Sequence, residues 1–86
     1  MNVIAISRFK KEAKFLVKKY RSLLNELEAL IESLETNPMQ GVFLGKDCYK
    51  IRLAIASKGR GKSGGARVIT HIYIRGATVF LLTIYH

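Results

Sequence analysis

The residues of this chain that could do chemistry gather in its second half, where cations occur without acids. Residues 48–86 hold seven Lys and Arg and no Asp or Glu, whereas residues 1–47 hold eight Lys and Arg against six acids, a net of +2. A region with a net of +7 repels itself unless something anionic neutralises it. Nucleic acid is the usual anion, so the sequence predicts a nucleic-acid-binding surface here.

Strand-like alternation places many of these cations on one side of a sheet, because successive side chains of a strand point to opposite faces. In residues 48–56 and 66–74, polar and basic positions alternate with Ile, Leu and Val. Such a face offers the donors and stacking groups that single-stranded nucleic acid needs, although a solvated outer face is the alternative. We expect this open face to carry Lys50, Arg52, Arg67, His71 and Tyr73, joined by Thr83 and Tyr85 from the last strand.

The segment ASKGRGKS, residues 56–63, satisfies a loose phosphate-loop pattern. A nucleotide-binding loop must open into a helix, yet Gly64 and Gly65 lead into a β-branched run that begins at Val68. We therefore interpret the segment as a basic loop whose cations touch nucleic-acid phosphates, namely Lys58, Arg60 and Lys62.

Metal-dependent catalysis is not expected, because a two-metal nuclease needs clustered carboxylates and the acid outside the predicted helices, Asp47, stands alone. His71 is a candidate general acid or base, with a packing role as the alternative, and Cys48 reads as a small buried hydrophobe. Metal-free cleavage of RNA stays open: the 2′-hydroxyl attacks the adjacent phosphate, and arginines stabilise the added charge through their bidentate fork. No cofactor is expected.

Two amphipathic helices precede the predicted sheet, after a short strand at residues 2–6. The first helix starts at Arg8 and the second stops before Pro38, whose ring disfavours helical geometry in the residue before it. The apolar stripe of the first comprises Phe9, Ala13, Leu16, Val17 and Tyr20, opposite an arc of lysines. That of the second comprises Leu23, Leu24, Leu27, Leu30, Ile31 and Leu34.

Residues 48–56, 66–74 and 77–85 are predicted strands, and Arg75-Gly76 predicts a tight hairpin between the last two. The fold class is therefore α+β, in the order β-α-α-β-β-β, with both helices on one face of a twisted, mainly antiparallel four-stranded sheet. Residues 1–86 suit one domain. No apolar stretch approaches the ~20 residues of a membrane span, and no signal peptide is visible, so we expect a soluble, cytoplasmic protein.

The sequence also resembles a known family, the RelE/HigB-type toxins of the RelE/ParE toxin-antitoxin superfamily. The resemblance covers nearly the whole chain and is carried by FKKEAKFLVKKY (residues 9–20), NPMQGVFLG (37–45) and YKIRLAIASKGRGKSGGARVIT (49–70). It implies a RelE-like fold, ribosome-dependent cleavage of mRNA without a cofactor, and neutralisation by a cognate antitoxin. Arg52 and Arg67 look like the family's strand arginines at the scissile phosphate, and Lys50, Lys58 and Lys62 match its basic positions less closely.

The resemblance departs from the family at the C-terminus, because members usually continue with a short charged tail whereas this sequence reaches Tyr85-His86. Without such a tail, Val79 and Leu81 are expected to be partly exposed. The leading hypothesis is an mRNA endoribonuclease in which Arg52 and Arg67 stabilise the transition state, with His71 and Tyr85 as further catalytic candidates. The alternatives are a ParE-like toxin that inhibits gyrase, and a catalytically inactive module that binds RNA or an antitoxin.

Overall fold

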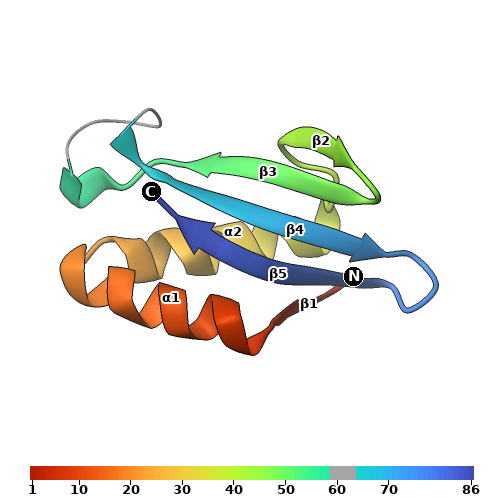
Figure 1. The fold of residues 1–86 in the computed structure, drawn as a ribbon, viewed down its shortest axis with the longest axis horizontal. Helices are drawn as coiled ribbons and strands as arrows, with labels where there is room; N and C mark the ends of the chain where they lie inside the picture. The colour runs from red at the N-terminus through yellow and green to blue at the C-terminus, as the bar shows by residue number, and fades with distance from the viewer. Residues whose placement is uncertain (59–63) are drawn as a thin grey trace.

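The computed structural model describes residues 1–58 and 64–86 and shows two helices packed against a five-stranded mixed sheet (Figure 1). This arrangement confirms the predicted fold class. The elements in chain order are β1 (Asn2–Ala5), α1 (Ser7–Lys19), α2 (Leu23–Thr36), β2 (Val42–Gly45), β3 (Cys48–Leu53), the short 3₁₀ helix η1 (Ala56–Lys58), β4 (Ala66–Tyr73) and β5 (Thr78–Tyr85).

The sheet has the strand order β1-β5-β4-β3-β2, in which β1 runs parallel to β5 and the other pairs are antiparallel. The sequence predicted four strands, and the fifth is β2, which lies within the predicted connection. A two-residue turn at Lys46 and Asp47 joins it to β3, and both residues have positive φ values, 51° and 62°. Such a turn suits the twist of a hairpin, but it is normally marked by Asn-Gly or Asp-Gly, which this sequence lacks.

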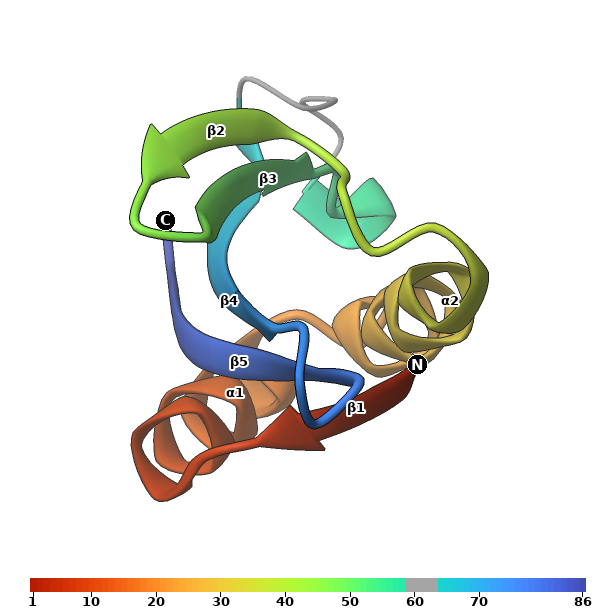
Figure 2. The same cartoon turned by 90° about the vertical axis from the view of Figure 1, so that its right-hand side faces the viewer.

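The helices bury the predicted apolar stripes with one exception: Leu24, which the prediction placed in the stripe of α2, is 53% exposed. Leu23, Leu27, Leu30 and Leu34 of α2 are buried at helical spacing. Figure 2 shows α2 inside the curve of the sheet and α1 beside β5. The core between the helices and the sheet includes Phe9 and Leu16 of α1 together with Ile51, Val68, Ile72, Val79, Leu81 and Ile84 of the sheet.

A bulge in β5 decides which of its side chains face the core. The pairing with β4 shifts between Ile69↔Thr83 and Thr70↔Leu81, which leaves Leu82 as an extra residue. The expectation that Val79 and Leu81 are partly exposed is therefore wrong, since both have 0% exposure beneath the sheet. Beyond the bulge the alternation changes phase, so that Ile84 is buried and Tyr85 points outward.

Candidate nucleic-acid interface

A row of three predicted site side chains crosses the sheet at one end of β3, β4 and β5. Arg52 lies directly opposite Arg67 in the register of β3 and β4, and Arg67 lies directly opposite Tyr85 of β5. Directly opposite residues point to the same face and have Cα atoms about 4.5–5.5 Å apart. The fold thus brings together two arginines and a tyrosine that are up to 33 positions apart in the sequence (52 to 85).

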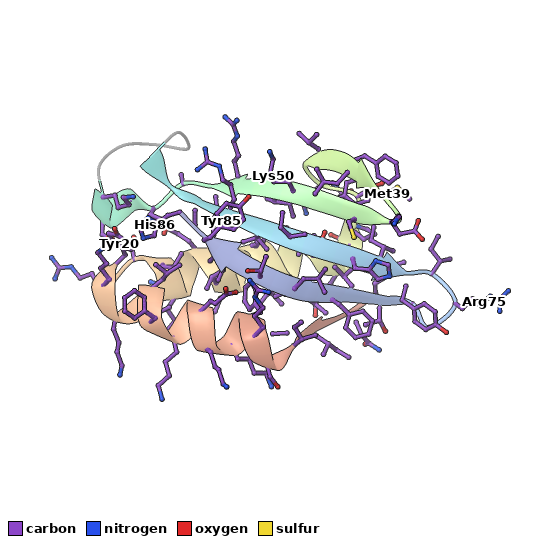
Figure 3. All side chains as sticks on the ribbon, viewed as in Figure 1. Tyr20, Met39, Lys50, Arg75, Tyr85 and His86 are labelled. Atoms are coloured by element: carbon purple, nitrogen blue, oxygen red, sulfur yellow. The ribbon has the colours of Figure 1, made fainter. Side chains whose placement is uncertain are left out.

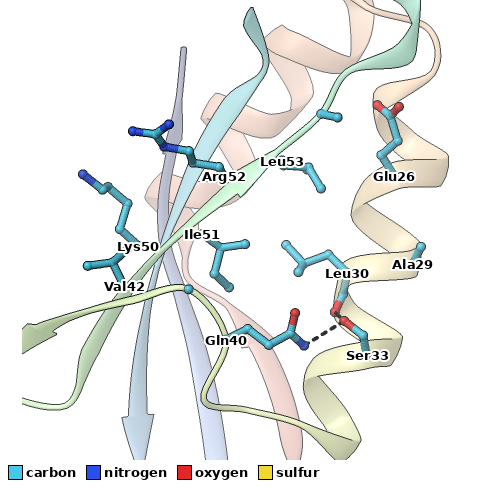
Figure 4. Close-up of a pocket in the computed structure, with 12 residues that line it drawn as sticks. Glu26, Ala29, Leu30, Ser33, Gln40, Val42, Lys50, Ile51, Arg52 and Leu53 are labelled. Atoms are coloured by element: carbon cyan, nitrogen blue, oxygen red, sulfur yellow. Dashed lines mark hydrogen bonds between the residues drawn. The ribbon is translucent and has the colours of Figure 1, made fainter. Parts of the chain in front are cut away.

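The face that carries this row, which we call the arginine face, is the one turned away from α2. Figure 4 shows Arg52 and Lys50 projecting from one side of β3 while Ile51 and Leu53 point toward Leu30 of α2. Arg52 is exposed and Arg67 is half-buried, while Tyr85 is 43% exposed. Side chains at these positions can reach an oligonucleotide strand that lies across the sheet.

The positive charges of Arg52 and Arg67 are not neutralised by an ion pair within the part of the chain that the structure describes. Among the residues that the structure describes, one ion pair occurs, Arg8–Glu12 at 3.4 Å, and it involves neither Arg52 nor Arg67. Like charges directly opposite each other in a sheet are destabilising. The fold therefore holds two cations in repulsion at a place where a phosphate would relieve it.

The row is fixed by the close approach of the chain at the start of β4. Gly65 packs so tightly on the carbonyl of Leu53 that a Cβ atom there would clash with the oxygen. The adjoining 3₁₀ helix η1 is tied to α2: the Ala56 N–H donates to Glu26 Oε2 at 2.7 Å, and the Ser57 N–H donates to Ser22 Oγ at 2.9 Å. The Gly65 contact and the pairing of Leu53 with Ala66 set the start of β4 beside the end of β3, and the two hydrogen bonds anchor the segment that follows β3 to α2.

The basic loop is described only in part. Lys58 is half-buried, and its Nζ lies 5.1 Å from the centre of the Tyr20 ring, which suits a cation–π contact. Lys58 therefore lies beside α1 rather than over the middle of the sheet. Arg60 and Lys62 lie outside the described residues.

Two further predicted site residues lie well away from the arginine row. His71 is four residues along β4 from Arg67, about 13 Å at the usual rise per residue, and its Nδ1 is 3.5 Å from the Sγ of Cys48. Tyr73 is two residues further on and 50% exposed. The structure brings together Arg52, Arg67 and Tyr85, and Lys50 follows Arg52 on the same face of β3. His71 is a diagonal neighbour of Lys50, but neither it nor Tyr73 lies beside Arg52, Arg67 or Tyr85.

Glu12 of α1 closes the free edge of β5 beyond β1, near Tyr85. Its Oε1 accepts from Thr83 Oγ1 at 2.6 Å and from the Ile84 N–H at 3.2 Å, and its Oε2 accepts from Arg8. Burial raises the pKa of Glu12, but the hydrogen bonds from Thr83 and Ile84 and the charge of Arg8 outweigh it, so that the net pKa lies below its ordinary value. The carboxylate therefore stays ionised at neutral pH.

Aromatic residues beside the row were missed by the sequence reasoning. His86 packs edge-to-face on Tyr20 with ring centres 5.9 Å apart, and Figure 3 shows both near Tyr85 at one end of the molecule. Phe15 of α1 is 68% exposed. The signal in the sequence was a phenylalanine placed on the lysine arc of an amphipathic helix, away from the apolar stripe.

The described part of the chain offers no group of three or more His, Cys, Asp or Glu side chains that could hold a metal ion. Neither of its α-helices is long and apolar enough to cross a bilayer.

Comparisons with solved structures identify the fold. The chain is similar to a chain of the intact E. coli RelBE toxin-antitoxin complex, with a TM-score of 0.72 and 22% identity over 96% of this chain and 92% of that chain. It is similar to an E. coli toxin RelE double mutant in the free state (TM-score 0.71, 22% identity, 96% and 79% coverage) and to that mutant bound to an antitoxin RelBc peptide (0.63, 25%, 96% and 79%). No protein-family model matches the chain, and no curated protein matches it.

The chain therefore has the RelE fold, and the resemblance seen in the sequence is confirmed at the level of the fold. At these identities the comparison speaks to architecture, so the chemistry must be argued from the residues of the arginine face.

Proposed function

We propose that this protein is the toxin of a type II toxin-antitoxin pair and that it cleaves mRNA at the ribosome without a metal ion. The observation that carries the proposal is the cross-strand pair Arg52–Arg67, two unneutralised guanidinium groups on an open sheet face. The RelE fold of the chain supports it, as does a net charge of +9. The proposal places the protein in the cytoplasm, where its partners would be mRNA, the ribosome and a cognate antitoxin.

The chemistry follows from what such a face can do to RNA. The 2′-hydroxyl gives up its proton to solvent on this open face while its oxygen forms a new bond to the adjacent phosphorus. The bond to the 5′-oxygen breaks, and the phosphate carries additional negative charge in between. Arg52 and Arg67 would hold the phosphate oxygens from two sides through bidentate hydrogen bonds. Tyr85, opposite Arg67, would donate a proton to the departing 5′-oxygen, and Lys50 would bind a neighbouring phosphate.

Replacing both arginines tests this function. We expect the R52A/R67A double variant to lose growth inhibition in cells and to fold as the parent does, because neither side chain belongs to the core. Circular dichroism and thermal unfolding provide the control for folding. A double variant that is folded and still as toxic as the parent would end the assignment.

Primer extension on cellular mRNA after induction separates cleavage from the other activities of such a fold. New 5′ ends that appear with the parent and vanish with R52A/R67A support cleavage. Growth arrest without new ends would instead indicate a toxin that acts on a protein target such as gyrase. Salt-sensitive RNA binding with neither new ends nor arrest would indicate an inactive binding module.

A further inference from the structure

A hollow beside the arginine face lies between α1 and the C-terminal end of β5. We call it the α1–β5 hollow. It measures about 480 Å³, and its walls include Phe15 and Leu16 of α1 together with Ile84 and Tyr85 of β5. This volume lies within the range of sites that take small organic groups, about 300–1,000 Å³. Tyr85 belongs both to this hollow and to the arginine row, so the two sites are continuous.

The chemistry of the hollow is aromatic inside and cationic outside. Phe15 is 68% exposed, and Lys11, Lys18 and Lys19, its neighbours three and four positions away on the helix, are exposed as well. Lys11 lines the hollow itself, as does His86. Exposed aromatic rings among cations are the combination that single-stranded nucleic acid requires, because bases stack on the rings while lysines meet the phosphates.

The side-chain carboxylate at the hollow, that of Glu12, is already engaged. Glu12 accepts from Thr83, Ile84 and Arg8, so three donors share its charge. Its presence therefore does not turn the hollow into an anion-repelling site. The charge around the hollow is complementary to a phosphate chain.

We propose that the α1–β5 hollow is a nucleobase subsite, in which one unpaired base of the RNA on the arginine face stacks on Phe15. This inference rests on the proposed function in one respect, since it takes the RNA strand to lie across Arg52, Arg67 and Tyr85. Phe15 is then a binding residue that gives the strand its register, and Lys11 binds a phosphate next to the stacked base.

The test measures binding rather than cleavage. The first probe is a short, fluorescent, uniformly 2′-O-methylated oligoribonucleotide, which is not cleaved because it lacks the attacking hydroxyl. The second is a set of the same oligomers in which one base is removed at each position in turn. Four full-length proteins are compared at low salt: the parent, F15A, F15W and F43A. Phe43 lies on β2 and is 59% exposed, so F43A is the matched loss of an exposed phenyl ring outside the hollow.

We expect F15A to bind the intact oligomer about fivefold more weakly than the parent, the lower end of what a stacked base contributes. Removing one particular base should weaken binding to the parent by a similar factor and have no effect on binding to F15A. F15W should bind as the parent does, and F43A should be unchanged. Thermal unfolding of F15A should match the parent, because the ring is exposed and alanine favours helix.

Equal binding by F15A and the parent, or the same base-removal profile for both, would overturn the subsite. So would a parent protein that does not bind the oligomer at all. The proposed cleavage can fail separately. If binding depends on Phe15 but no new 5′ ends form in cells, the subsite is supported and the assignment as a ribonuclease is refuted.

Discussion

Neutralising either arginine of the cross-strand pair should stabilise the fold even though it removes the proposed activity. Arg52 and Arg67 start from opposed positions whose Cα atoms are about 5 Å apart. If the guanidinium groups kept that separation they would repel by roughly 0.8 kcal/mol in water, and a wider separation gives less, within the roughly 0.2–1 kcal/mol seen for cross-strand pairs. We therefore expect R52Q and R67Q each to raise the free energy of unfolding by about 0.5 kcal/mol.

Urea denaturation at about 0.01 M and about 1 M salt checks this expectation, because the Debye length falls from roughly 30 Å to roughly 3 Å between these conditions. The gain should be present at low salt and absent at high salt. The double variant R52Q/R67Q should gain little beyond either single variant, since one substitution already removes the repulsion. R75Q, at the hairpin between β4 and β5, is the matched control and should show no such gain.

The reasoning is refuted if R52Q and R67Q are both less stable than the parent at low salt. It is equally refuted if their gains persist unchanged at high salt. The first result would mean that the two guanidinium groups stabilise the folded protein, and the second would mean that the gain does not come from charge repulsion. With either result, the argument for a site awaiting a phosphate would fall.

Two further predictions concern the surroundings of the site. The lowered pKa of Glu12 means that its contribution to stability is present above its ordinary pKa near 4.5 and is lost as the pH falls through the folded value. E12Q should therefore be about 1 kcal/mol less stable than the parent at pH 7. Urea titrations at several pH values should show this difference in stability shrinking below pH ~4.5. A difference that does not change with pH would contradict the prediction. Thr70 is fully buried and its Oγ1 lacks a hydrogen-bond partner among the described residues. T70V should therefore raise the free energy of unfolding by about 1 kcal/mol in the same assay. A decrease would show that the hydroxyl forms a hydrogen bond in the folded protein.

Much of the fold could be predicted because its signals are local. The helical stripes needed only the spacing of Leu and Phe along the chain, and Pro38 needed only its own ring to mark the end of α2. The strands β3 and β4 alternate without interruption, so the side of the sheet that carries Lys50 and Arg52 was predicted correctly. Periodicity of this kind does not depend on what the chain folds against.

Other features depend on partners that the sequence does not name. The strand β2 has four residues and is defined by its pairing with β3 across a turn whose residues, Lys46 and Asp47, give no hairpin signal. The bulge at Leu82 exists only in the register between β4 and β5. The sequence therefore did not reveal that Val79 and Leu81, expected to be partly exposed without a C-terminal tail, face the core, where the structure buries them.

The sequence by itself determined that the second half of the chain carries unopposed positive charge and that its strands turn this charge toward one face. Charge and alternation are properties of the residues in order, so no fold was needed to read them. Only the tertiary structure decided that Arg52 stands opposite Arg67, that Tyr85 completes their row, and that Phe15 of α1 borders the same place. The strand register and the placement of α1 decide which of these residues are neighbours. Both arise from contacts between segments that are far apart along the chain.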